Sequence, residues 1–282
     1  MSEAIFARLR YGVISTSVAL MELLIEYEDL ATVEDLVERF GPDALRAELK
    51  ENRMGCARIV RMLGAGFDVP GEHASVEAGI ASARTLFDWS VQQSEETSVA
   101  LYSLGNPRIL GEATSEIVRW MVSLGVVGAE TRALQIGCGI GRIEQALAPR
   151  VREAIGIDIS SEMITVARRR CAGLANVSFA TCSGHDLADF PDERFDLVYA
   201  IDSFPYLVQA GMELVRTHVL EAERVLTPGG CLALASFSYR GSAFDTVMAA
   251  RLAEEAGLVL GSNGDRPFQT WDAAVFVMTK PS

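Results

Sequence analysis

The sequence predicts an α/β protein in which a parallel sheet follows an N-terminal helical region. Hydrophobic residues make up 49% of the 282 residues and charged residues 22%, which is typical of a globular chain with a substantial core. From about residue 130, short apolar runs alternate with helical patterns. Continuous apolar strands separated by helices are typical of a parallel sheet with helices on both faces.

The region before about residue 125 has helical periodicity. Apolar residues recur every three to four positions at Val18, Met21 and Ile25 and again within 32–64, so each stretch predicts amphipathic helices. A further helix is expected from about Ser75 to Gln92. The pair Asn106-Pro107 predicts a helix start, because Asn caps helices and Pro favours the first turn.

Seven apolar segments in the second half are expected to be strands. The segment at 258–260 is the weakest of them. The expected strands span 132–137, 153–158, 177–182, 195–201, 231–237, 258–260 and 273–280.

The composition argues against several classes of partner. Lys and Arg number 25 against 38 Asp and Glu, a net charge of −13, so we expect neither nucleic acid nor an anionic membrane surface to bind. No run of about 18 apolar residues predicts a membrane span, and the first 30 residues lack a signal-peptide pattern. Five scattered cysteines without C-x-x-C, and three histidines without metal-ligand spacing, predict a cytoplasmic protein without disulfides or a metal site.

A glycine-rich turn follows the first expected strand. Gly137, Gly139 and Gly141 stand between the strand and a short helix, where glycine lets the backbone approach a ligand. The next strand ends in Asp158, 21 residues after Gly137, where a carboxylate can accept both ribose hydroxyls of an adenosine ligand. Met163, one helical turn later, would lie against adenine or in the core.

The spacing excludes two common nucleotide-binding motifs. A dinucleotide fingerprint needs G-x-G-x-x-G, but the sixth position is Arg142 or Glu144, depending on the glycine from which the count starts. A P-loop fails because no GK[ST] follows.

Four blocks, LQIGCGIG, GIDIS with EM, FPDERFDLVYAIDSF and RVLTPGG, stand in the order and spacing of a known family. Over about residues 105–280 the sequence resembles the class I S-adenosylmethionine-dependent methyltransferases. The resemblance implies a Rossmann-like seven-stranded methyltransferase sheet, with its last strand antiparallel, and an N-terminal all-helical lid. We therefore expect a helical lid at 1–105 and a cofactor-binding domain at 106–282.

The resemblance also implies where S-adenosylmethionine binds. The glycines would line its methionine end, Asp158 its ribose, the 183–186 loop its adenine, and the 200–203 segment its sulfonium. Thr227–Gly230 would be a structural turn. The implied cofactor-binding residues are Tyr102, Gln135, Gly137, Gly139, Gly141, Asp158, Ile159, Met163, Ser183, Gly184, His185, Ala200 and Asp202. Gln135 departs from the acid usual in the family, and Asp186 could replace the acid missing at Ser183.

Methyl transfer needs alignment of a nucleophile more than a particular catalytic residue. The candidates for acid–base roles are Asp202 after the fourth strand, His185 in the adenine loop, and Tyr206, which would share a helical face with Asp202. Tyr102 would close over the cofactor or pack in the core. Trp271 would line the acceptor cleft or, more in keeping with its position between the last two strands, lie in a surface loop.

These expectations favour a methyltransferase that acts on a hydroxyl or amine of a small-molecule metabolite. Two alternatives remain open: a nicotinamide-dependent reductase on a related sheet, and a non-catalytic, cofactor-binding scaffold protein. The N-terminal helices could also form a homodimer interface. The sequence identifies neither the acceptor nor its nucleophilic atom.

Overall fold

The computed structural model describes residues 2–65, 73–237 and 240–282. The chain divides into two compact units. One comprises Met1–Val69, Trp89–Glu116 and Phe268–Asp272; the other comprises Pro70–Asp88, Ile117–Pro267 and Ala273–Ser282. The helices α5 (Val76–Gln93) and α7 (Pro107–Ser123) therefore contribute to both units. The domain boundary expected after residue 105 stays a prediction.

The first unit is helical, as the periodicity predicts. Besides parts of α5 and α7, it contains α1 (Ser2–Arg10), α2 (Thr16–Tyr27), α3 (Leu30–Phe40), α4 (Asp43–Gly64), α6 (Glu95–Val99) and the 3₁₀-helix η1 (Leu101–Ser103). The predicted cap of α7 is confirmed, because Asn106 Oδ1 accepts a hydrogen bond from the Arg108 amide at 2.9 Å. Among the described residues, no helix has both the length and the apolar character needed to cross a membrane.

The segment between the last two strands also belongs to the first unit, and it is not a surface loop at Trp271. The Trp271 side chain is 1% exposed, and its ring stacks on Tyr102 with centroids 5.5 Å apart. Phe268 stacks on the same indole at 5.3 Å. The surface-loop expectation is wrong because Trp271 is buried between the ring of Phe268, in its own segment, and that of the distant Tyr102.

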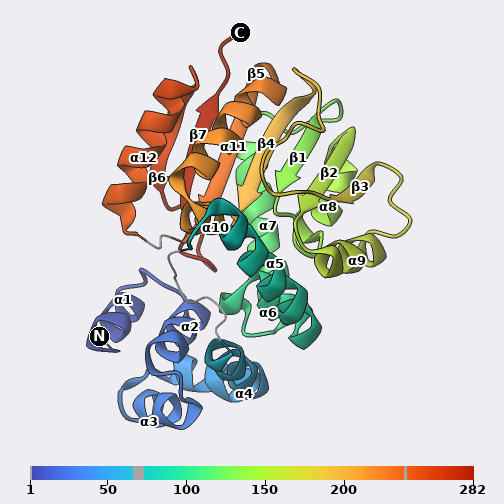
Figure 1. The fold of residues 1–282 in the computed structure, drawn as a ribbon. Coiled ribbons are helices and arrows are strands. Elements are labelled where there is room, and N and C mark those ends of the chain that lie inside the picture. Colours follow the sequence, from blue (N-terminus) through green and yellow to red (C-terminus); the bar gives the residue numbers. More distant parts are fainter. Residues whose placement is uncertain (1, 66–72, 238–239) are drawn as a thin grey trace. The chain divides into compact units, whose positions relative to one another are not determined.

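The second unit contains the predicted seven-stranded sheet (Figure 1), in the order β3-β2-β1-β4-β5-β7-β6. The strands are β1 (Arg132–Ile136), β2 (Glu153–Asp158), β3 (Val177–Thr181), β4 (Phe195–Ile201), β5 (Leu226–Ser236), β6 (Val259–Asp265) and β7 (Ala274–Thr279). The predicted antiparallel last strand is confirmed, since β7 runs antiparallel to both β5 and β6. β5 begins earlier than expected, because Thr227–Gly230 lies within it and the Gly229 amide donates to the Lys280 carbonyl at 2.9 Å.

Apolar clusters cover both faces of the sheet. On one face, Leu134 and Ile136 share a cluster with residues of α10 (Phe204–Ala210), α11 (Met212–Val225) and α12 (Ser242–Glu255). On the other face, Cys138 and Phe179 pack with α9 (Ser161–Arg170), which follows β2. The short helix α8 (Arg142–Leu147) follows the glycine turn, and the 3₁₀-helix η2 (Ala148–Arg150) comes directly after it. Alternate residues of each strand point to opposite faces, which explains the near-continuous apolar strands in the sequence.

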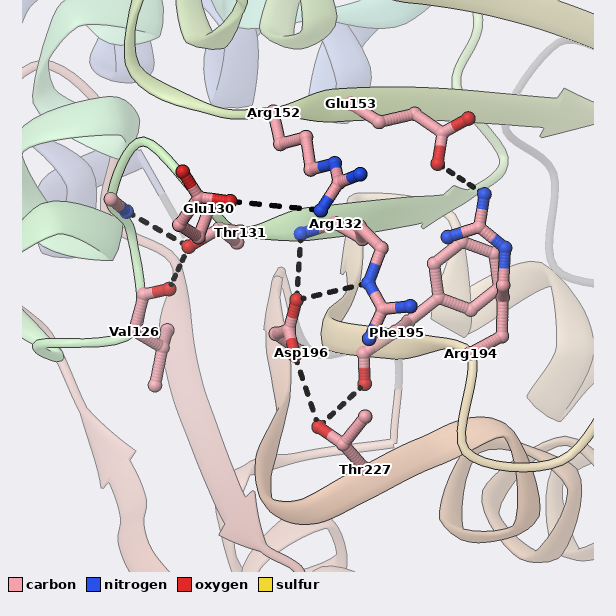
Figure 2. Close-up of polar contacts among 11 residues, drawn as sticks. Val126, Glu130, Thr131, Arg132, Arg152, Glu153, Arg194, Phe195, Asp196 and Thr227 are labelled. Atoms are coloured by element: carbon pink, nitrogen blue, oxygen red, sulfur yellow. Dashed lines mark hydrogen bonds and ion pairs between the residues drawn. The ribbon is translucent and has the colours of Figure 1, made fainter.

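Charged side chains join the amino ends of the central strands (Figure 2). Asp196 accepts hydrogen bonds from the Arg132 amide at 2.8 Å and from Thr227 Oγ1 at 3.2 Å, so one carboxylate links β1, β4 and β5. Arg152 pairs with Glu130 at 3.6 Å, and both of these side chains are more than 60% exposed. The two carboxylates therefore differ in what they contribute to the fold.

We expect Asp196→Ala to destabilise the protein by about 1–3 kcal/mol, because it leaves the Arg132 amide without its acceptor. Glu130→Ala is the matched control and should cost less than about 0.5 kcal/mol, as is usual for an exposed pair. Urea unfolding of both variants measures the difference. Equal losses in the two variants would contradict this assignment.

Candidate active site

The glycine turn lies at the carboxyl end of β1, where the sequence places it. Gly137, Gly139 and Gly141 have φ values of 70°, 52° and 72°. Residues that carry a Cβ rarely adopt this left-handed backbone conformation. The amides of Gly137 and Cys138 both donate to the Ile157 carbonyl, at 2.8 and 3.0 Å. The turn is thus attached to β2 before any ligand binds.

Asp158 ends β2, as predicted, and it also holds the glycine turn. Its Oδ2 accepts from the Gly139 amide at 2.8 Å, and its Oδ1 accepts from the Ser160 amide at 2.9 Å. Burial, together with the nearby charge of Asp88, raises the pKa of Asp158 to about 6 despite these bonds. A carboxylate has about four acceptor sites, so Asp158 keeps acceptor capacity beyond these two bonds, and its ribose role stays a prediction.

The end of β4 lies directly beside the glycine turn. A Cβ on Gly137 would come within 2.4 Å of Ser203 Cβ, so this position requires glycine. Ser203 Oγ donates to the Ile136 carbonyl at 2.7 Å. The preceding residue, Asp202, has a φ of 59°, and its amide donates to the Ala235 carbonyl of β5 at 2.8 Å. Asp202 precedes α10 instead of belonging to it, so it does not share a helical face with Tyr206.

The loop after β3 carries the second predicted acid–base candidate. Gly184 is buried with a φ of 84°, and a Cβ there would lie 2.7 Å from Ile159 Cγ2. His185 is exposed, and its amide donates to Ser183 Oγ at 3.2 Å. Because β2 and β1 stand between β3 and β4, the structure does not bring His185 and Asp202 together.

A buried polar cluster lies beneath the turn, and sequence reasoning missed most of it. Gln135 is 2% exposed, and in the orientation that satisfies its amide it donates to both Glu144 oxygens, at 2.7 and 3.2 Å. Tyr199 is the cross-strand neighbour of Gln135 and also hydrogen-bonds Glu144. Gly156 leaves space for the carboxyl group of Glu144, since a Cβ at position 156 would lie 2.8 Å from Glu144 Oε1. Burial raises the pKa of Glu144 to about 8.

The part of α5 between Ile80 and Asp88 contributes further residues to the site. Asp88 Oδ1 accepts from Ser160 Oγ at 2.6 Å, and Arg84 Nε donates to the Ile159 carbonyl at 3.1 Å. Ile80 lies against the position of a Cβ on Gly184, at 3.3 Å. The helical pattern of this segment did not identify these residues as part of the site, because tertiary packing determines which groups they contact.

The remaining predicted cofactor residues occupy varied environments. Met163 and Ala200 are buried, Ile159 is half-buried, and Ser183 is exposed. Tyr102 is fully buried in the first unit. The cofactor contacts assigned to all of these residues stay predictions.

Comparison with known proteins agrees with this geometry. Residues 134–234 match the family described as a methyltransferase domain. A demethylmenaquinone methyltransferase of Tropheryma whipplei (strain Twist) is 33% identical over 159 residues, which are 56% of this chain and 60% of that protein. The 27-O-demethylrifamycin SV methyltransferase of Amycolatopsis mediterranei is 36% identical over 135 residues, 45% of this chain and 46% of that protein.

A solved structure supports the fold. The phosphoethanolamine N-methyltransferase 1 of Haemonchus contortus superposes with a TM-score of 0.59 at 17% identity, covering 74% of this chain and 51% of that one. At this identity the likeness concerns the fold alone.

The sheet order, the glycine turn after β1 and the carboxylate ending β2 define a nucleotide-binding α/β protein of the Rossmann-like class. The matching methyltransferase domain at 134–234 and the similar methyltransferases support the class I S-adenosylmethionine-dependent methyltransferase family that the motifs predict. The chain spans 60% or less of the length of the two curated relatives described above.

The buried Glu144 predicts an unusual pH dependence of stability. Its pKa is raised from 4.5 to about 8, so its contribution to stability is fully present below pH 4.5 and is lost as the pH rises through 8. Relative to the wild type, Glu144→Gln should therefore gain unfolding free energy between pH 5 and pH 9. Chemical denaturation across this range measures it, with the exposed Glu254→Gln as control. A difference that does not change with pH would contradict the assignment.

Proposed function

We propose that this chain binds S-adenosylmethionine at the carboxyl ends of β1, β2 and β4 and methylates a hydroxyl or amine of a small molecule. The observation that carries the proposal is one hydrogen bond. The Gly139 amide donates to Asp158 Oδ2 at 2.8 Å and so joins the glycine turn to the expected ribose ligand. Three glycines at positive φ give the turn a conformation in which backbone amides can approach a ligand, and a carboxylate with remaining acceptor capacity suits a ribose. The residues present therefore fit this cofactor.

When bound, S-adenosylmethionine supplies a methyl carbon activated by the adjacent sulfonium. The chain's own contribution is alignment of the acceptor and removal of its proton. Asp202 suits the second role, because it lies at the end of β4 beside the glycine turn and its Oδ1 accepts from the Phe237 amide at 3.4 Å. His185 suits removal of the proton less well, because this residue follows β3, which β2 and β1 separate from β4.

An apolar cavity supports an apolar acceptor. It has a volume of about 30 Å³ and lies between α10, α12, β5 and β7. Most of its lining is apolar, including Phe204, Leu234 and Phe276, with Arg240 and Asp245 as its charged members. Phe237 also lines it, and the Phe237 amide donates to Asp202. The cavity is smaller than a metabolite, so we propose that it takes an apolar edge of the acceptor while the reacting group stays near Asp202. Two relatives are named as methyltransferases of demethylmenaquinone and 27-O-demethylrifamycin SV, which supports a small-molecule acceptor.

Other expectations about the whole protein stay predictions. These are the lid role of residues 1–105, the homodimer, and a cytoplasmic location. No observation in the described residues favours the reductase or the scaffold alternative over methyl transfer.

Asp158→Ala should lower the affinity for S-adenosylmethionine about 10- to 150-fold. It removes an acceptor of two charge-assisted hydrogen bonds, worth about 1.5–3 kcal/mol in total effect. Isothermal titration calorimetry measures the loss, and Asp189→Ala, an exposed acid after β3, is the control. Circular dichroism must confirm that the variant folds, because Asp158 also holds the glycine turn. Unchanged affinity in a folded variant would refute the ribose role.

Gly139→Val should abolish cofactor binding, because valine tolerates a φ of 52° poorly and would distort the turn. Gly257→Val is a matched control, since Gly257 also has a positive φ, of 68°, but has open space around it. Both variants should lose stability, while Gly257→Val alone should keep the rise in melting temperature that the cofactor causes. If the cofactor raised the melting temperature of Gly139→Val as much as that of the wild type, the cofactor would bind elsewhere.

The reaction itself is tested with purified protein, S-adenosylmethionine and a fractionated metabolite extract. We expect a product heavier than its precursor by one methylene, enriched in the apolar fractions, with formation of S-adenosylhomocysteine. Cofactor binding without any such product would favour the scaffold alternative. Binding of a nicotinamide dinucleotide in place of S-adenosylmethionine would favour the reductase.

A further inference from the structure

Helix α5 reaches the predicted ribose acid through a chain of hydrogen bonds. Asp88 Oδ1 accepts from Ser160 Oγ at 2.6 Å, and the Ser160 amide donates to Asp158 Oδ1 at 2.9 Å. The other oxygen of Asp158 accepts from the Gly139 amide at 2.8 Å. Ser160 is fully buried and Asp88 is half-buried, so water is excluded from the bonds at Asp158 and only partly from the bond between Ser160 and Asp88. Asp88 is thus linked to the glycine turn through two intermediate residues.

One face of α5 makes all of these contacts. Ile80, Arg84 and Asp88 are spaced four residues apart, which places them on the same side of a helix. Ile80 lies against Gly184, and Arg84 and Asp88 bind the Ile159–Ser160 segment after β2. This face therefore contacts both loops that are expected to hold the adenosine part of the cofactor.

Asp88 also stabilises the start of α9. Its Oδ1 accepts from the Glu162 amide at 3.3 Å, while Ser160 Oγ accepts from the Met163 amide at 3.1 Å. A negative charge near a helix N-terminus is favourable. The side chain of Asp88 therefore does two things: it supports the Ser160 cap at the start of α9, and it brings a second negative charge close to Asp158.

The other titratable groups of this region do not cancel the charge of Asp88. They come from the glycine turn, α8, the end of β3, α9 and α5 itself: Cys138, Arg142, Glu144, Cys182, Glu162 and Arg84. Two of these groups are cations. Arg142 acts on Glu144, and Arg84 Nε is bound to the Ile159 carbonyl. The charge of Asp88 therefore opposes ionisation of Asp158.

We propose that Asp88 is a positioning residue for the cofactor: through Ser160 it fixes the carboxyl group of Asp158, and its charge sets the pH range over which that group holds the ribose. The inference rests on the proposed function, because it takes Asp158 as the ribose ligand. Asp88 itself needs no contact with the cofactor.

The direction of the pH effect follows from the ionisation of Asp158. Its pKa is about 6, so affinity for an adenosine cofactor should fall as the pH drops through 6 and the carboxylate is protonated. Removing the negative charge at position 88 favours ionised Asp158. A variant without that charge should therefore keep its affinity to a lower pH than the wild type.

The test is calorimetric titration of the full-length protein with S-adenosylhomocysteine between pH 5 and pH 8. Asp88→Asn keeps an oxygen that can accept from Ser160 but removes the charge. We expect its affinity at pH 8 to lie within about twofold of the wild type and its pH midpoint to move lower. Asp88→Ala also loses the hydrogen bond and should bind about 10-fold more weakly at pH 8, as the loss of one partly buried hydrogen bond to a charged group predicts. Glu77→Gln, an exposed acid on the same helix, should behave like the wild type.

The outcomes separate the two proposals. If the wild type does not bind S-adenosylhomocysteine at any pH, the proposed function fails and this inference fails with it. If the wild type binds but Asp88→Asn keeps the wild-type pH midpoint, the role of Asp88 is refuted while the proposed function stands. Should Asp88→Ala not fold, the midpoint of Asp88→Asn decides alone.

Discussion

A single buried carboxylate, Asp158, holds the candidate site together. It gives up water and receives peptide N–H donors from Gly139 and Ser160, which partly offset its desolvation. The bond to Gly139 fixes a turn whose residues otherwise have the greatest conformational freedom in the chain. The site is thus formed in advance of its ligand, because its carboxylate is already oriented.

The protein buries two carboxyl groups near the end of β1, and their surroundings favour opposite states. Asp158 is surrounded by backbone donors and has a pKa of about 6, so it is ionised at neutral pH. Glu144 is completely buried, and its hydrogen-bond partners are the side chains of Gln135 and Tyr199. Burial raises its pKa to about 8 and so favours the protonated form. A neutral Glu144 beneath the turn avoids a second full charge next to Asp158, which suits a protein that already carries a net charge of −13.

The sequence predicted what is local and missed what depends on tertiary contacts. The strands of the sheet, the glycine turn and Asp158 could be recognised because apolar runs, glycines and a strand-terminal acid follow one another along the chain. Glu144 could not, since a glutamate in a first helical turn is normally exposed, and the sole hint was Gln135 in an apolar strand. Asp88 was missed and Trp271 was assigned to a surface loop for the same reason: their partners, Ser160 and Tyr102, lie 72 and 169 positions away.

The sheet order explains why the candidate residues divide into two groups. From β1 the chain builds outward to β2 and β3, and then returns to place β4 on the other side of β1, so β1 lies at a topological switch point. Asp158 and the α5 contacts gather on the β2 side, whereas Asp202 and the apolar cavity lie on the β4 side. A cofactor lying across the glycine turn would have its nucleoside on the first side and its reactive methyl on the second. In that arrangement a proton acceptor is useful on the β4 side alone, which favours Asp202 over His185.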